Sequence, residues 1–335
     1  MKKLLAFCLC SSIFSIVTAQ TPKAKDIYVA GSELDGKKYV AKYWKNGIAT
    51  SLTDGTNDAY AESIFVSGTD VYVAGYEDNG KKTVAKYWKN GIATNLSDSS
   101  NAAYAQSIVV AGNDVYVAGY ERKSPWVTVA TYWKNGIATN LTDGTAAAQA
   151  RSIAISGTDV YISGHEKKNM IWVAKYWKNG IATNLTDGTK DSEANSIFIK
   201  GSDVYVAGDE SNGTKSVAKY WKNGIATNLS DGTESTFPHS IVVAGTDVYV
   251  IAIVYSPHNE AKYWKNGILS NIFEGTGNAV ANSIVVDGTD VYIAGSVDKL
   301  REYVSTATYW KNGIATYISS DLSRHSTATS IFITK

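Results

Sequence analysis

Short runs in which apolar and polar residues alternate fill the chain from about residue 26 to its end. Across residues 63–96, four such runs rich in Val, Ile, Tyr and Thr follow one another: SIFVS, VYVAGYE, TVAKYW and IATNL. Glycine and asparagine stand between them, in GTD at residues 68–70 and KNG at 89–91, and supply the positive φ of tight hairpin turns. No helical periodicity of any length appears. The pattern predicts four antiparallel strands in this unit.

The same unit recurs along the whole chain. YWKNG occurs seven times, and successive copies are 43 to 46 residues apart. Its tryptophans are Trp44, Trp88, Trp133, Trp177, Trp221, Trp264 and Trp310. Four short strands repeated at this period are typical of a β-propeller blade. We therefore expect an all-β fold, a seven-bladed β-propeller with four antiparallel strands per blade.

The two ends of the chain complement each other. The first unit begins at KDIYVAG and lacks the opening strand that contains Ser-Ile, whereas the chain finishes on one, ATSIFITK. Residues 330–334 are therefore expected to pair with residues 26–31 and to complete blade 1, which removes open sheet edges. A β-helix, the main structural alternative, would gain nothing from such a shared unit.

These units resemble those of secreted bacterial YWKNG-type repeat proteins, and they are similar to kelch-type propeller repeats through the VYVAG strand and the aromatic residue of the third strand. The resemblance covers about residues 26–335. It implies that the Ser-Ile strands are innermost and the IATNL strands outermost, and it implies no activity. The chain departs from kelch repeats in having one glycine instead of a pair, and in placing Trp directly after Tyr.

Residues 1–19 read as a secretory signal peptide, because a basic MKK precedes a short apolar run and a small-residue cleavage site. Residues 20–335 then form a single propeller domain. Export to the periplasm, the cell surface or the medium is expected, with no transmembrane span. Cys8 and Cys10 lie in the signal, so the rest of the chain has neither a disulfide nor a cysteine nucleophile. A lipoprotein modification at either cysteine is disfavoured by the bulky residues before it.

Composition and charge limit the classes of binding partner that are expected. Without Lys2 and Lys3, 30 basic side chains face 31 acidic ones, so neither nucleic acid nor an anionic membrane is expected as a partner. A closed ring needs no partner to cover an edge, and a monomer is expected. One Asp per TDGT turn is ordinary turn chemistry, so neither a metal site nor a cofactor is predicted.

Comparison of the repeats separates two faces. The GTD-type and KNG connections hardly vary and lie on one face of an up-and-down blade, while the other two connections vary strongly. Variation of this kind gathers where each blade is free of packing constraints, often on the binding face. The residue before each Ser-Ile is always polar and is expected at the mouth of the central channel. These rim residues are Glu62, Gln106, Arg151, Asn195, His239, Asn282 and Thr329.

Aromatic residues supply further candidates for ligand binding. Tyr60, Tyr104 and Phe237 stand two residues before the rim residue of their blades, and a polar rim with aromatics suits a small polar ligand or a sugar. Trp126 and Trp172 are the tryptophans of blades 3 and 4 outside the YWKNG motif. They either form an exposed pair for a sugar or protein partner, or each covers its own loop.

Two recurring residue types have plainer explanations. The seven YWKNG tryptophans are expected to pack between blades. A Glu closes the second strand in five blades, and pairing with a nearby Lys is the expected role. These residues are Glu33, Glu77, Glu121, Glu166 and Glu210.

On these grounds the sequence favours a secreted non-catalytic binding module that recognises a carbohydrate or a cell-surface protein through its variable face. No catalytic residue is assigned, because no GxSxG, P-loop or Asp-box motif occurs. The alternative is a hydrolase or lyase with one active site at the channel mouth. That alternative requires two carboxylates, or a carboxylate and a histidine, to converge with shifted pKa values, and Glu62 is the one rim carboxylate. A purely structural scaffold remains a third possibility.

Overall fold

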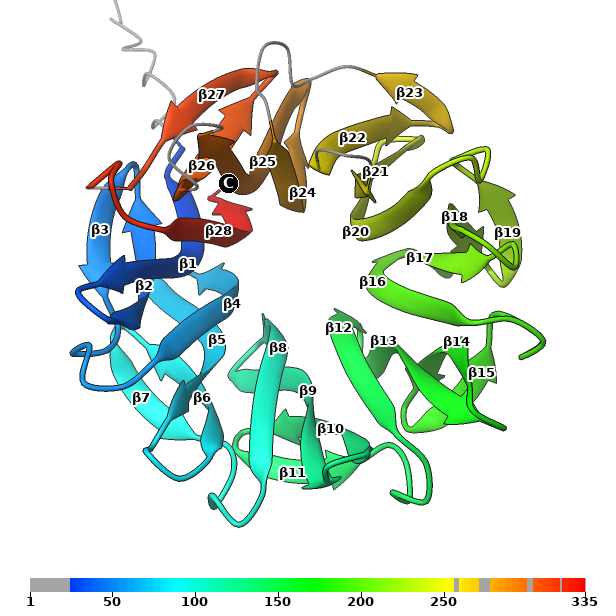
Figure 1. Cartoon of the computed structure of the whole chain (residues 1–335), viewed down its shortest axis with the longest axis horizontal. Coiled ribbons are helices and arrows are strands. Elements are labelled where there is room, and N and C mark those ends of the chain that lie inside the picture. Colours follow the sequence, from blue (N-terminus) through cyan, green and yellow to red (C-terminus); the bar gives the residue numbers. More distant parts are fainter. Residues whose placement is uncertain (1–24, 256–258, 271–277, 300–303, 320, 335) are drawn as a thin grey trace, which may run out of the picture.

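Seven four-stranded sheets stand in a ring around a central channel in the computed structural model (Figure 1). The structure describes residues 25–255, 259–270, 278–299, 304–319 and 321–334. The predicted signal peptide, with Cys8 and Cys10, lies outside these residues and stays a prediction. Within them, no helix is long and apolar enough to cross a membrane. The predicted seven-bladed all-β propeller is confirmed.

Each blade runs antiparallel from an inner strand at the channel to an outer strand at the perimeter. The inner strands, from blade 1 to blade 7, are β28 (Ser326–Ile333), β4 (Ala59–Ser67), β8 (Ala102–Ala111), β12 (Ala148–Ser156), β16 (Ser192–Lys200), β20 (Ser235–Ala244) and β24 (Ala279–Asp287). The second strands are β1 (Ile27–Asp35), β5 (Asp70–Asp78), β9 (Asp114–Ser124), β13 (Asp159–Lys168), β17 (Asp203–Ser211), β21 (Asp247–Tyr255) and β25 (Asp290–Lys299).

The third strands, which carry the YWK sequence, are β2 (Lys38–Lys45), β6 (Thr83–Lys89), β10 (Val127–Lys134), β14 (Ile171–Lys178), β18 (Ser216–Lys222), β22 (Asn259–Lys265) and β26 (Val304–Lys311). The outer strands are β3 (Ile48–Ser51), β7 (Ile92–Asn95), β11 (Ile137–Asn140), β15 (Ile181–Asn184), β19 (Ile225–Asn228), β23 (Ile268–Ser270) and β27 (Ile314–Tyr317). The Ser-Ile strands are thus innermost, as the repeat resemblance implied.

The ring closes by pairing of the two chain ends. Strand β28 pairs antiparallel with β1, in a register that sets Ile333 opposite Ile27 and Ser330 opposite Ala30. The predicted closure is confirmed, and the pairing extends further, to Ser326 opposite Glu33. The red C-terminal strand therefore lies beside the blue N-terminal one in Figure 1.

The core lies between neighbouring blades. Six of the seven YWKNG tryptophans are less than 2% exposed, and each packs into a cluster that draws residues from two blades. Trp88, for example, contacts a cluster that includes Tyr28 and Ala30 of blade 1 and Val73 of blade 2. Burial of an aromatic side chain of this size contributes a few kcal/mol. The expected role of these tryptophans in packing is confirmed.

The invariant turns are joined by one hydrogen-bond network per blade. In blade 4, Asn179 has φ 51° and is followed by Gly180 at φ 84°, the two positive values that a two-residue hairpin turn needs. Its Nδ2 donates to Asp159 Oδ1 at 2.8 Å and its Oδ1 accepts the Val160 N–H at 2.8 Å. Lys178 pairs with the same aspartate at 2.8 Å. The network recurs in every blade, which explains why GTD and KNG hardly vary.

Four of the five glutamates at the end of the second strand are paired with a lysine of the third strand, as expected. The pairs are Glu33–Lys42, Glu77–Lys86, Glu166–Lys175 and Glu210–Lys219. In blade 3 the lysine is replaced by Thr131, and burial raises the pKa of the remaining Glu121.

Candidate functional site

A β-bulge sets each rim residue apart from the ladder of its blade. In β4, for instance, the pairing with β5 passes from Ala61 opposite Gly75 to Ser63 opposite Ala74. No residue of β5 therefore lies opposite Glu62. The same shift occurs in all seven inner strands, always at the residue before Ser-Ile. A bulge redirects a side chain and increases local twist. It therefore turns seven polar side chains, of six residue types, toward the channel.

The single glycine of VAG makes the bulge possible. A Cβ at Gly75 would lie 1.9 Å from the carbonyl oxygen of Tyr60, and one at Gly119 would lie 1.9 Å from that of Tyr104. No side chain fits at that distance, so the position opposite the bulge requires glycine. Blade 6 is the exception, with Ala252 opposite Pro238.

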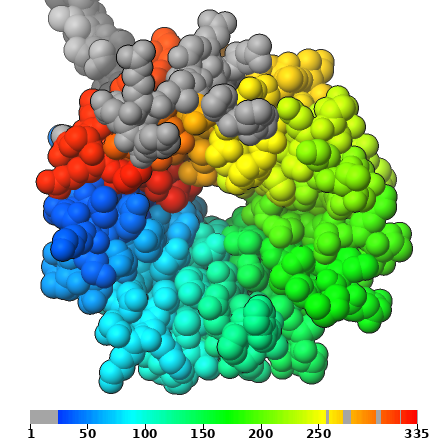
Figure 2. Space-filling view, viewed as in Figure 1, coloured from blue at the N-terminus to red at the C-terminus, as the bar shows by residue number. Residues whose placement is uncertain are grey.

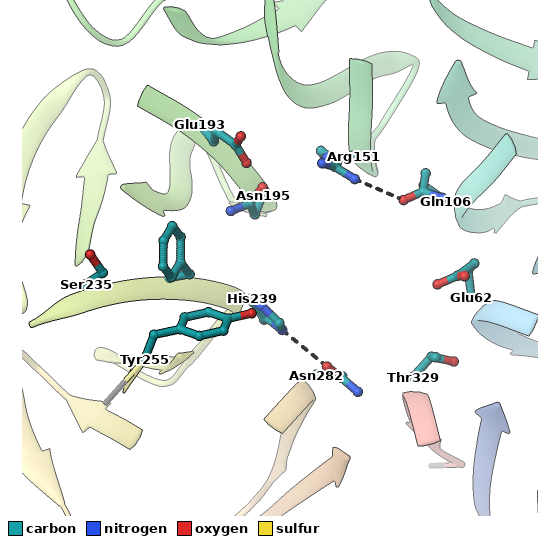
Figure 3. A pocket seen from close by; sticks show the side chains of 11 residues that line it. Glu62, Gln106, Arg151, Glu193, Asn195, Ser235, His239, Tyr255, Asn282 and Thr329 are labelled. Atoms are coloured by element: carbon teal, nitrogen blue, oxygen red, sulfur yellow. Dashed lines mark hydrogen bonds between the residues drawn. The ribbon is translucent and has the colours of Figure 1, made fainter. Parts of the chain in front are cut away.

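The bulged residues line one cavity of about 690 Å³ at the channel mouth. Figure 2 shows the opening at the centre of the ring, and Figure 3 shows the side chains around it. All seven predicted rim residues line this cavity, and so does Phe237. Three further residues, Glu193, Ser235 and Tyr255, complete the lining.

One arc of the rim is tied to the next blade. Asn195 Nδ2 donates to the Pro238 carbonyl at 3.2 Å, Asn282 Nδ2 donates to the Ala328 carbonyl at 2.9 Å, and Thr329 Oγ1 donates to the Ala61 carbonyl at 2.7 Å. Each acceptor is the residue immediately before the next bulge. These three side chains satisfy backbone groups that the bulge removes from the ladder.

The opposite arc is centred on Arg151. Its Nη1 donates to Gln106 Oε1 at 3.4 Å, and its side chain points into the cavity between Gln106 and Glu193 (Figure 3). The guanidinium charge acts on Glu62, Glu193 and His239 alike, which come from three other blades. The charge of Arg151 therefore reaches groups on several sides of the cavity.

Burial shifts three titratable groups of the cavity toward their neutral forms. It raises the pKa of Glu62, although hydrogen bonding to Tyr76 and the charge of Arg151 oppose the shift. It also raises the pKa of Glu193, where Arg151 opposes and Asp191 adds to the shift. Burial lowers the pKa of His239, against hydrogen bonds to Asn282 and to the backbone of Ala281. Removal of water disfavours the charged form of each group.

The tautomer of His239 follows from its neighbour. Asn282 donates through Nδ2 to a backbone carbonyl, so its Oδ1 faces His239 Nδ1, at 3.2 Å. An oxygen can only accept, so Nδ1 carries the proton in the neutral ring and the lone pair is on Nε2. This pairing is drawn as a dashed line in Figure 3.

Two of the predicted aromatic site residues lie outside the cavity lining. Tyr60 and Tyr104 belong to a series of aromatic rings, Tyr39, Tyr60, Tyr76, Tyr104 and Tyr120, with centroids 4.9 to 5.2 Å apart. They pack on one another because blades 2 and 3 place tyrosines at matching positions. Their predicted role at the cavity is not supported by this placement, whereas Phe237 packs edge-on against Tyr255 on the cavity wall, with centroids 5.2 Å apart.

The second pair of predicted residues is divided between two environments. Trp172 is half-buried and packs edge-on against the His165 ring, with centroids 4.7 Å apart and Lys167 above it. Trp126 is 88% exposed at the β9–β10 turn. Of the two alternatives, Trp172 therefore fits the one in which the side chain covers its own blade, whereas Trp126 stands exposed. No group of three or more potential metal ligands occurs in the described part of the chain.

The architecture is shared with propellers of known peptidases. No family profile and no curated protein matches this chain. It is similar to the β-propeller domain of the Trilobed protease from Pyrococcus furiosus, titled as having an open velcro topology, with 9% identity, a TM-score of 0.57 and coverage of 89% of this chain and 92% of that one.

Two longer peptidases are also similar. A puromycin-hydrolyzing peptidase of Mycobacterium tuberculosis gives 11% identity and a TM-score of 0.57, and the acylaminoacyl peptidase of Pyrococcus horikoshii gives 12% and 0.53. In each case 88% of this chain is covered, but only 53% of the peptidase, so the chain spans about half their length.

These findings overturn the predicted non-catalytic binding module. The similar solved structures are the propeller domain of a protease and two peptidases, not binding proteins. The sequence also counted one rim carboxylate, whereas the cavity holds two, Glu62 and Glu193. Glu193 was missed because its position, two residues before the bulge, was singled out for aromatic residues alone, although it faces the cavity in blade 5 as it does in blade 6.

Proposed function

We propose that this protein is a hydrolase whose active site is the channel mouth, and that it cleaves amide bonds in peptides. The observation that carries the proposal is the meeting of Glu62, Arg151 and His239 in one cavity, with the carboxyl and the imidazole both shifted toward neutrality. A protonated carboxyl and an unprotonated imidazole are the states that a general acid and a general base need. The similarity of the fold to two peptidases supports peptides as substrates.

Each residue takes one role in the proposed reaction. His239 Nε2 accepts a proton from a water molecule, whose oxygen attacks the amide carbonyl carbon. Arg151 stabilises the negative charge that develops on the carbonyl oxygen. Glu62 donates its proton to the leaving nitrogen as the C–N bond breaks. Asn282 holds the imidazole in the required tautomer through Nδ1, as the orienting residue does in other base-activated sites.

The test is cleavage of a defined peptide mixture, followed by mass spectrometry, with the purified wild-type protein and with the variants Glu62→Gln and Arg151→Gln. The wild type is expected to release products, Glu62→Gln to slow release by about 100- to 10,000-fold, and Arg151→Gln by about 100- to 1,000-fold. Glu260→Gln is the matched control, because Glu260 lies on β22, 52% exposed and outside the cavity.

Two results would contradict the proposal. One is an absence of cleavage by the wild type. The other is equal cleavage by the wild type and all variants, which would assign the activity to a contaminant or to another site.

A further inference from the structure

One side of the cavity has no part in the proposed proton transfers. It consists of Glu193, Phe237 and Tyr255, from blades 5 and 6, and is here called the amine subsite. In Figure 3 the Glu193 carboxylate and the Tyr255 ring lie on the same side of the opening, opposite Glu62. Its chemistry differs from that of the Arg151 side, because it joins an acidic group to exposed aromatic surface.

The Glu193 carboxylate is open to the cavity. Its side chain is 35% exposed, and no hydrogen bond from the described residues reaches its oxygens. His165 Nδ1 lies 4.0 Å from Oε2, too far for a hydrogen bond. His165 is 1% exposed, and burial holds its pKa well below the ordinary value, so it supplies no positive charge. Among the described residues, Glu193 is therefore an acidic side chain without a cation in direct contact, and an ammonium group bound beside it would stabilise its ionised form against the effect of burial.

The aromatic pair is equally unusual for this ring. Tyr255 is 54% exposed and packs edge-on against Phe237, which lines the cavity. At the position of Phe237, blades 2 and 3 place Tyr60 and Tyr104, which are engaged with other tyrosines. In blade 6, Ala252 also replaces the glycine opposite the bulge. Pro238 replaces the alanine that precedes the rim residue in the other blades. Its departures from the repeat coincide with the aromatic wall.

We infer that this subsite binds the protonated amine of the substrate, together with the apolar group beside it. An ammonium group can contact a carboxylate and the faces of aromatic rings at once, and both interactions strengthen where water is displaced. The favoured substrate is accordingly a peptide with a free amino terminus and an apolar first residue. Its first carbonyl would then point toward the Arg151 side of the cavity. This inference rests on the proposed function for the reaction, but not for the binding.

The test measures binding in the Glu62→Gln background, so that its outcome is independent of cleavage. L-phenylalaninamide and N-acetyl-L-phenylalaninamide differ in the charge of the amine, and calorimetry or ligand-observed NMR gives both affinities. We expect the free amine to bind at least tenfold more tightly than the acetylated compound. Glu193→Gln, a nearly isosteric change, should abolish this preference. Phe237→Leu should weaken binding of the free amine about threefold to tenfold and keep the preference.

Glu260→Gln in the same background serves as the control and should leave both affinities unchanged. Equal affinity for the two compounds, a preference that survives Glu193→Gln, or no binding of the free amine would each overturn the inference. Circular dichroism of every variant confirms that it is folded before binding is compared. If the amine preference is found but the wild type cleaves no peptide, the subsite stands and the proposed hydrolysis fails.

Discussion

The two faces of the ring stabilise their irregular backbone in opposite ways. On the invariant face, Asp, Asn and Lys side chains satisfy the turn in every blade, so each copy needs the same three residues. At the channel mouth, the bulge is accommodated by a glycine of the second strand, which leaves the side chain of the bulged residue free of any structural duty in some blades. A position can therefore vary between blades where its side chain is not needed to satisfy backbone groups.

The rim residues themselves fall into two groups, those that hydrogen-bond to the next blade and those that do not. Asn195, Asn282 and Thr329 each donate to a carbonyl of the next blade and so resemble the turn residues in function. Glu62 and Arg151 do not, and they are the residues assigned to chemistry here. A ring of equivalent positions therefore contains both structural and reactive members, and the hydrogen-bond partners tell them apart.

The strongest way to break the comparison is to remove the glycine. Gly119→Val should destabilise the protein by more than about 3 kcal/mol, because its Cβ would lie 1.9 Å from the Tyr104 carbonyl oxygen. Urea unfolding measures the loss. As the control, Gly112→Ala meets open space and has only the positive φ of 60° against it, so about 1–2 kcal/mol is expected. Equal losses in the two variants would show that the bulge tolerates a side chain.

Buried polar residues behind the rim offer a second test. Asp209 follows the glycine of blade 5 and is 4% exposed. Burial and the neighbouring charge of Glu193 raise its pKa to about 7. The contribution of Asp209 to stability is therefore fully present below pH 3.8, the unfolded value, and is lost as the pH rises to about 7.

Asp209→Asn removes this titration. Relative to the wild type, the variant should gain up to about 4 kcal/mol between pH 3.8 and pH 7, at about 1.4 kcal/mol per pH unit. Urea midpoints measured across this range for both proteins give the difference. A constant difference between the two proteins at all pH values would show that Asp209 is already ionised in the folded protein.

Much of the fold could be predicted from the sequence because the same strand and turn pattern recurs in every repeat. The Asn-Gly turns and the 43- to 46-residue period predicted the blades, and the incomplete first unit predicted the pairing of β28 with β1. The seven rim residues were also found, since one shared position identifies all of them. Their ability to bind a ligand stays a prediction.

The remaining parts of the site depend on contacts that no repeat position reveals. Glu193 and Phe237 occupy the same position as Tyr60 and Tyr104, yet the tyrosines pack on tyrosines of neighbouring strands. For Trp172 the sequence left two alternatives open, because its partner, His165, stands on the adjacent strand β13. In each case the side chain opposite decides whether a residue faces the cavity, and that pairing varies from blade to blade.

A third prediction compares two asparagines, one from each face of the ring. Asn179→Ala removes two hydrogen bonds and places alanine at φ 51°, so a loss of about 2–3 kcal/mol is expected. Asn195→Ala removes one hydrogen bond, to the Pro238 carbonyl, and should cost about 1 kcal/mol. Urea unfolding of both variants measures the difference. A larger loss at Asn195 would reverse the assignment of structural duty between the two faces.

The smallest effect on stability is expected for substitution of Gln106, a rim residue without a hydrogen bond to the backbone of the next blade in the described part of the chain. Its recorded contact is the 3.4 Å bond from Arg151, so Gln106→Ala should change the free energy of unfolding by no more than about 0.5 kcal/mol. If Arg151 stabilises charge in the transition state, a guanidinium that has lost its acceptor should lower kcat about tenfold and leave KM nearly unchanged. A rise in KM at constant kcat would instead place Gln106 in substrate binding. A loss of stability above 1 kcal/mol would instead group Gln106 with Asn195, Asn282 and Thr329, which hydrogen-bond to the next blade. A side chain that makes no such bond can be removed without weakening the ring.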